Sequence, residues 1–98
     1  MNNEICFQHN LMVFTTWGVL RKEKPLLRVF HDNDGDWQFL PGTELDGEEP
    51  ALVGLGEMVE FDPSVQTLLS LGFGKVAVRA NVDSDWVIME YPPTEPQS

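Results

Sequence analysis

Short runs that alternate between apolar and polar residues, separated by breaks rich in glycine and proline, constrain the fold of this chain most. The best of them lie at 11–16, 26–31, 36–40, 75–80 and 85–90. A period of two places successive side chains on opposite faces of a strand. None of the apolar runs approaches the ~20 residues that a membrane-spanning helix needs. The pattern predicts an antiparallel β-sheet of about five to six short strands.

The strongest local signal is HDNDGDWQFLPG at 31–42. Asp34 and Gly35 lie between two alternating runs, and both residue types tolerate the positive φ angles of tight hairpin turns. We therefore expect residues 26–40 to form an antiparallel hairpin that turns at 33–35.

A calcium loop is the alternative interpretation of the acids in this stretch, Asp32, Asp34 and Asp36. Counted from Asp32, an EF-hand loop needs glycine at its sixth position and glutamate at its twelfth. Trp37 and Thr43 stand there instead, and the flanking residues have the pattern of strands. We predict a turn with solvated charges and no metal site.

Residues 61–72, FDPSVQTLLSLG, carry the signals of a helix start. Asp62 is a favoured N-cap residue, and Pro63 fits the first helical position. The preceding residues 56–60 are compatible with one more helical turn. The apolar stripe that follows the cap predicts packing against the sheet: Val65, Leu68 and Leu69. The predicted fold class is α+β, with one or two short helices packed on one face of the sheet.

The strand patterns also predict which side chains lie in the core. Trp37 and Phe39 share a face and are expected there. The run ALVGL at 51–55 is expected to form a short buried strand. The last two runs are expected to pair as a hairpin, with three side chains of the 75–80 run facing the core: Val76, Val78 and Ala80.

The charge balance restricts the classes of partner. Sixteen Asp and Glu stand against six Lys and Arg, which gives a net charge of −10 and a pI near 4.3. A field of this sign repels phosphate backbones and anionic lipid headgroups and attracts basic proteins. We expect no nucleic-acid or membrane partner. The acidity also has a simpler interpretation, namely that it keeps a small domain soluble.

Length and composition indicate a single domain. Ninety-eight residues suffice for one modest core. We assign residues 1–90 to a single α+β domain and 91–98, YPPTEPQS, to a disordered proline-rich tail. The one cysteine, Cys6, and an N-terminus without the pattern of a secretory signal predict a cytoplasmic protein.

No constellation of residues in the sequence indicates catalysis. Cys6 and His9 are spaced like zinc ligands, but with His31 they do not complete a tetrahedral set. The glycine-rich stretches GLGEMV and GFGK lack the features of a phosphate-binding loop. We therefore predict no catalytic residues, no cofactor and no metal. An enzymatic or small-molecule role would need a deep pocket with convergent polar groups.

Two blocks of sequence resemble the bacterial immunity protein 33 family. GDWQFLPGTE at 35–44 is similar to the family's Gly-Trp-Arg-Phe-Phe-Ser-Gly-like block, and FDPSVQTLL at 61–69 is similar to its Asp-Pro-Ser helix start. The collinear resemblance covers residues 11–86. It implies a small binding protein that neutralises a toxin by direct protein–protein contact. The residues that carry the resemblance are Trp37, Phe39, Gly42, Glu44, Asp62, Pro63, Ser64 and Leu69.

Acidic side chains are the predicted contact residues for a basic toxin, because opposite charge accelerates association. Since they are close in sequence, we expect them to line one edge of the molecule: Asp32, Asp34, Asp36, Glu44, Asp46, Glu48 and Glu49. The alternative is a structural or regulatory interaction domain without a toxin, which forms a homodimer through a sheet edge.

Overall fold

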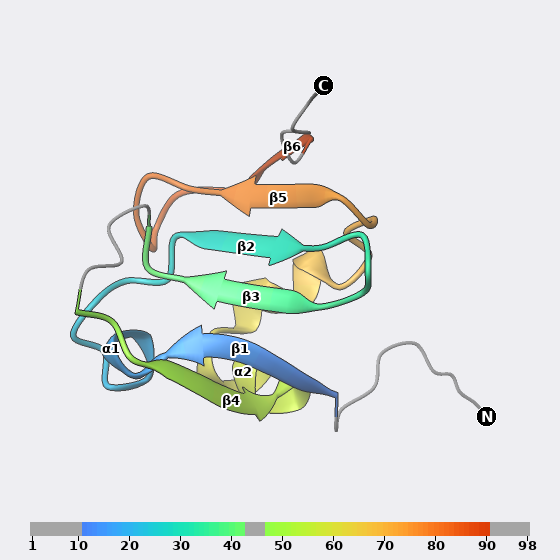
Figure 1. Ribbon diagram of the computed structural model, residues 1–98. Helices are drawn as coiled ribbons and strands as arrows, with labels where there is room; N and C mark the ends of the chain where they lie inside the picture. Colours follow the sequence, from blue (N-terminus) through green and yellow to red (C-terminus); the bar gives the residue numbers. More distant parts are fainter. Residues whose placement is uncertain (1–10, 43–46, 91–98) are drawn as a thin grey trace.

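The computed structural model describes residues 11–42 and 47–90, which build one six-stranded sheet with short helices (Figure 1). The elements in chain order are β1 (Met12–Thr16), α1 (Trp17–Leu20), β2 (Arg28–His31), β3 (Trp37–Leu40), β4 (Pro50–Gly54), α2 (Leu55–Phe61), the 3₁₀ helix η1 (Pro63–Leu68), β5 (Lys75–Val78) and β6 (Val87–Glu90). Figure 1 looks onto the sheet, with α2 and η1 behind it. The α+β class is confirmed.

The strand order is β4-β1-β3-β2-β5-β6, and one pairing differs from the expected antiparallel sheet. β1 and β3 run parallel, with Phe14 beside Gln38, whereas every other pairing is antiparallel. The reason is the order in space: β3 returns from the β2 hairpin and inserts between β1 and β2. Alternation within each run predicts strands but does not encode which strand inserts beside which.

The hairpin expected at 26–40 is confirmed. β2 and β3 pair from Arg28 opposite Leu40 to His31 opposite Trp37. The turn is closed by hydrogen bonds from Asp32 N–H to the Asp36 carbonyl, at 2.8 Å, and from Gly35 N–H to the Asp32 carbonyl, at 2.9 Å. Gly35 has φ of +95°, which only glycine adopts without strain.

The helical segment differs from its prediction in type and extent. Asp62 is the N-cap, and its Oδ1 accepts the Ser64 N–H at 3.0 Å, but the segment it caps is a 3₁₀ helix. The α-helix lies upstream, at Leu55–Phe61. Proline disfavours the α conformation at the residue before it, and Asp62 is extended, with φ of −143°. Pro63 therefore separates α2 from η1.

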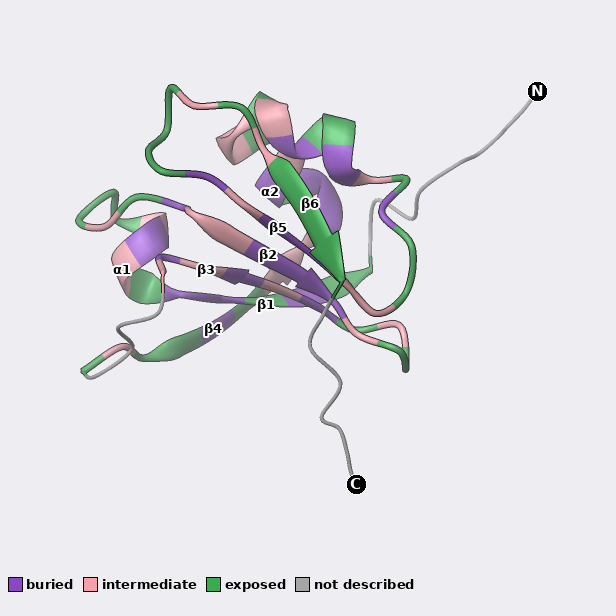
Figure 2. Ribbon diagram, turned by 90° about the horizontal axis from the view of Figure 1, so that it is seen from above, coloured by how far each residue is buried: buried purple, intermediate pink, exposed green. Residues whose placement is uncertain are grey.

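The core lies between the sheet and these two helices, as the buried faces in Figure 2 show. Val65 and Leu68 of η1 are buried, and Leu69 is partly buried against the core. The strands supply Val29, Phe39 and others from a single face of the sheet. The expectation for Trp37 and Phe39 is confirmed.

The prediction for β5 was wrong in its phase. Val76 is buried as expected, but it lies with Val78 on the face opposite to Ala77, which is the β5 residue in the main core, and Ala80 is exposed. This strand is apolar at successive positions, so alternation did not fix its phase.

β4 was expected to be a buried strand, but it is an edge strand with Leu52 exposed. The predicted stretch also ran one residue too far, because Leu55 begins α2. Only Ala51 and Leu55 of that run are buried residues of the interior.

Truncating Leu68 should test whether η1 helps to close the core. Leu68 is 3% exposed, so Leu68→Ala should lower the free energy of unfolding by about 2–5 kcal/mol, because the deleted methyl groups leave a cavity. Gln66→Ala, at an exposed position of the same helix, is the control and should change it by no more than about 0.5 kcal/mol. Urea denaturation measures both. Equal midpoints for the two variants would contradict this account of the core.

Candidate protein-binding surface

One face of the sheet carries no helix within the part of the chain that the structure describes (Figure 1). The strand pairings align one residue from each strand into a row across this face. From β4 to β6 the row is Leu52, Phe14, Gln38, Phe30, Val76 and Met89. Five of these six side chains are apolar, which is unusual for a sheet face without a covering layer.

The apolar side chains on this face are most exposed near β1 and β4. Met12, Phe14 and Leu52 are 56%, 42% and 57% exposed, and Phe14 pairs directly with Leu52. We call these three residues the β1–β4 patch. The middle of the row is closed instead: Phe30 and Val76 are buried, and the Arg28 guanidinium carbon lies 4.8 Å from the centre of the Phe30 ring.

The acidic hairpin turn lies beside this patch. Because β1 is parallel to β3 with Phe14 beside Gln38, the start of β1 is at the same end of the sheet as the turn. Gln38 Nε2 donates a hydrogen bond to Asp32 Oδ2 at 3.0 Å. The other oxygen, Asp32 Oδ1, is buried and has no hydrogen-bond partner, an arrangement that costs free energy. Asp34 and Asp36 are exposed.

The acids that precede β4 lie at the opposite end of the sheet. The Trp17 N–H donates to the Glu49 carbonyl at 3.0 Å, which places this segment next to α1. Glu48 is engaged there: its carboxylate lies 2.5 Å from Lys24 Nζ. Hydrogen bonds from Lys24 and Thr16 lower the pKa of Glu48 below its ordinary value. Its carboxylate is thus committed within the chain.

The expectation that the seven predicted acids line one edge is therefore wrong. The hairpin acids and residues 48 and 49 lie at opposite ends, because β3 runs the length of the sheet between them. Glu44 and Asp46 lie outside the described residues. The structure brings the hairpin acids next to the β1–β4 patch, whereas Glu48 and Glu49 lie next to Trp17 at the other end.

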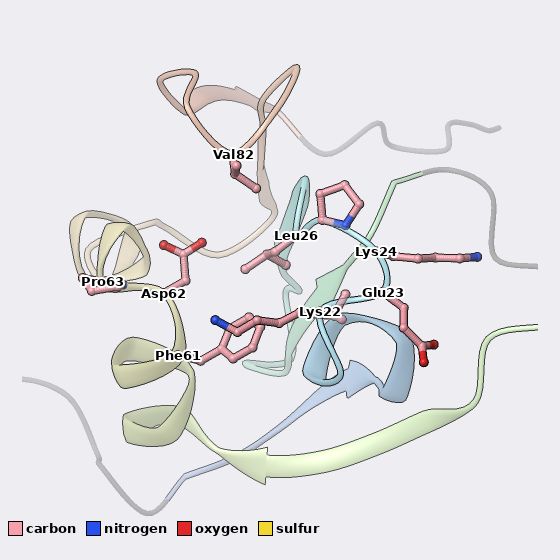
Figure 3. A pocket seen from close by; sticks show the side chains of 10 residues that line it. Lys22, Glu23, Lys24, Leu26, Phe61, Asp62, Pro63 and Val82 are labelled. Atoms are coloured by element: carbon pink, nitrogen blue, oxygen red, sulfur yellow. The ribbon is translucent and has the colours of Figure 1, made fainter.

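A pocket of about 520 Å³ lies between the 22–26 segment and the α2–η1 junction, with Val19 of α1 in its lining (Figure 3). Three of its four charged side chains make contacts within the chain. Lys22 Nζ lies 5.0 Å from the centre of the Phe61 ring, Lys24 pairs with Glu48, and Asp62 pairs with Arg79. Glu23, the fourth charged residue of the lining, is exposed, and one such group is not the convergent set of polar groups typical of a small-molecule site.

Arg79 organises the wall of this pocket. Its side chain is 2% exposed, and its Nη2 lies 2.7 Å from Asp62 Oδ2. Its guanidinium carbon also lies 4.1 Å from the centre of the Trp86 ring. The remaining contacts are hydrogen bonds from Nε to the Leu26 carbonyl at 2.9 Å, and from Nη1 to Ser64 Oγ at 3.1 Å and to the Val82 carbonyl at 3.4 Å.

The network also sets the protonation of Asp62. Burial raises the pKa of this carboxyl, but the hydrogen bonds from Ser64 and Arg79 outweigh burial, so the pKa is below its ordinary value. Asp62 is thus a structural carboxylate. The sequence identified it as a cap but gave no sign that Arg79, far along the chain, bonds to it.

His31 makes its contacts within the chain. His31 packs against Trp37 with ring centres 3.9 Å apart, and its Nδ1 lies 2.7 Å from the Leu71 carbonyl oxygen. Within residues 11–42 and 47–90, no group of three metal-ligating side chains comes together. Cys6 and His9, like the tail at 91–98, lie outside the described residues. No helix among those described is long and apolar enough to cross a membrane.

Comparisons with known proteins add no assignment. No family model matches the chain, and no match was found among curated proteins or solved structures. The resemblance to the immunity protein 33 family therefore stays a prediction from the residues that carry it.

Neutralising Asp62 should make stability depend on pH in a specific way. A carboxyl whose pKa is lower in the folded state stabilises the fold above its unfolded pKa, and loses this contribution as pH falls through the folded pKa. Asparagine still caps the helix, but Asp62→Asn leaves Arg79 buried without its carboxylate, so the variant should be destabilised at pH 7 by about 3 kcal/mol. The deficit should shrink as pH falls below the ordinary carboxyl value of 3.8.

Urea denaturation at pH 7 and at successively lower pH measures this deficit. The control is Asp83→Asn, which removes the same charge from an exposed position and should show little deficit at either pH. A deficit for Asp62→Asn that stays constant down to the acid limit would contradict the role of its charge.

Proposed function

We propose that this chain is a small cytoplasmic protein-binding domain that acts by occlusion and performs no catalysis. Its partner is a basic protein, held on the β1–β4 patch and the adjacent acidic hairpin turn. As the resemblance to the immunity protein 33 family implies, the partner is a bacterial toxin. The observation that carries the proposal is the exposure of Met12, Phe14 and Leu52 side by side on a sheet face without a helix among the described elements.

Apolar burial would provide the affinity. Solvent-exposed apolar groups of this kind gain about 25 cal/mol for each Å² that a partner removes from water. Phe14 is a suitable anchor, because aromatic side chains supply much of the energy at protein interfaces. Leu52 opposite it and Met12 on the same strand extend the apolar centre. The mostly uncharged row across the sheet fits an interface core, from which charged residues are depleted.

Charge would increase the association rate and the selectivity for a basic partner. The chain carries −10, and its hairpin acids lie at one end of the patch, where they would form a polar rim. A basic partner is attracted over a distance and oriented by such a rim, while acidic proteins and nucleic acids are repelled.

The second candidate function is a regulatory domain that works as a homodimer. The exposed edge strand β6 favours it, but two chains of −10 repel each other unless salt screens them. Sedimentation at two salt concentrations separates the candidates, since a monomer at both salt concentrations supports the first.

The apolar part of the surface is tested by a double substitution. Phe14→Thr with Leu52→Thr keeps strand-forming residues while removing the apolar anchor, so it should weaken partner binding at least tenfold. The control, Phe73→Thr, removes an aromatic side chain that is 65% exposed and contacts His31, and it should leave binding unchanged. Pull-down from the native host, followed by affinity measurement, supplies the test. Equal affinity for the double variant and the unchanged protein would remove the patch from the interface.

The acidic part is tested by association kinetics. Asp34→Asn with Asp36→Asn should slow association and reduce its dependence on salt, with little effect on dissociation, because rim charges act mainly on encounter. The matched control, Glu23→Gln with Glu49→Gln, removes the same charge from exposed positions next to α1. It should have a smaller effect. If the two pairs slow association equally, net charge rather than the hairpin governs the encounter.

A further inference from the structure

The two edges of the sheet differ in how they present their backbone. At the β4 edge, the Trp17 N–H bonds to the Glu49 carbonyl and the Leu55 N–H to the Leu11 carbonyl. Since antiparallel strands bond through alternate residues, odd-numbered residues of this segment bond to β1. The outward residues are therefore 50, 52 and 54.

The β4 edge is consequently poor at accepting another strand. Pro50 has no N–H, and the Gly54 N–H already donates to Glu57 Oε1 at 3.1 Å. Of these three residues, only Leu52 has an outward-pointing N–H that is available to another strand. Proline and a committed donor are devices by which proteins prevent unwanted strand pairing.

The β6 edge has neither device. The Arg79 N–H bonds to the Leu27 carbonyl, so odd-numbered residues of β5 bond to β2 and its even-numbered residues bond to β6. In β6 the residues that bond to β5 are then Val87 and Met89. The backbone groups of Ile88 and Glu90 point outward, where no described strand pairs with them.

The side chains of β6 also indicate a contact surface. All four residues are exposed, as the strand in Figure 2 shows, and the apolar three are 45–56% exposed. Two exposed acids, Asp83 and Asp85, precede this apolar stretch, and Glu90 at its end is paired with Lys75 of β5. A free, apolar edge next to acids is complementary to an extended segment that carries apolar and basic residues.

We propose that the outward side of β6 accepts an extended basic segment of the partner as a seventh strand of the sheet. This inference rests on the proposed function, because it describes how part of a basic partner is held. Backbone hydrogen bonds to Ile88 and Glu90 fix the register of the added strand. Basic side chains of the segment lie against Asp83 and Asp85. A second copy of this chain fits less well, because it would bring the same acids toward one another.

The probe is a seven-residue peptide that alternates lysine and valine, with a twin that is N-methylated at alternate residues on its hydrogen-bonding side. The twin keeps the charge and most of the apolar character but cannot donate along that side. The unmodified peptide should bind at least tenfold more tightly than the twin. On binding, amide hydrogen exchange should slow at Ile88 and Glu90. Equal affinity of the two peptides, or slowing confined to other strands, would overturn the proposal.

Two variants at position 88 locate the site on the protein. Ile88→Pro removes an outward N–H that β5 does not use, which an edge strand tolerates. This variant should bind the unmodified peptide at least tenfold more weakly than the unchanged protein does. Ile88→Thr keeps the outward N–H at the same position and a residue that favours strands, and it should bind the peptide nearly as well as the unchanged protein. If both variants bind like the unchanged protein, β6 is not the site. If Ile88→Pro does not fold, the affinities of the peptide and its N-methylated twin for the unchanged protein still test the proposal.

The native partner separates this inference from the proposed function. Loss of partner binding in the Phe14 and Leu52 double variant, with full binding by Ile88→Pro, overturns strand addition and leaves the protein-binding function standing. Failure to recover any protein partner overturns the proposed function, while the peptide comparison still reports on the β6 edge by itself.

Discussion

The buried guanidinium of Arg79 is the interaction on which the arrangement of this fold depends. It reaches three separate parts of the chain: the entry to β2 at Leu26, the α2–η1 junction at Asp62, and the loop after β5 at Val82. A buried arginine is stable only when its donors are satisfied and its charge is matched. The described residues meet both conditions at once. The network therefore holds the helices and the last hairpin together on one side of the sheet.

Concentrating the helices on one side has a consequence for the other side. The core is completed by α2 and η1 against residues such as Val29, Phe39 and Ala77, and no described helix remains for the opposite face. That face nevertheless carries an apolar row, whose exposed end at β1 and β4 meets the acidic hairpin. A small domain with this division has one face that stabilises it and one face suited to recognition.

The sequence predicted the elements better than their arrangement. The Asp-Gly hairpin and the cap at Asp62 depend on neighbouring residues, so local patterns were sufficient for them. The parallel pairing of β1 with β3 and the bond between Asp62 and Arg79 join distant segments, and no local pattern records them. The phase of β5 failed because Val76 and Ala77 are both apolar. The candidate surface was half predicted: the hairpin acids were named, but Phe14 and Leu52 became candidates only when the sheet placed them together.

The central claim is that the face without a described helix is the binding face, and hydrogen exchange on the free and partner-bound chain tests it most directly. On partner binding, amide hydrogen exchange should slow in β1, in β4 and in the 32–36 turn, and it should stay unchanged in α2 and η1. Protection concentrated in α2, η1 and the pocket at Lys22 and Phe61, with none in β1 or β4, would contradict it.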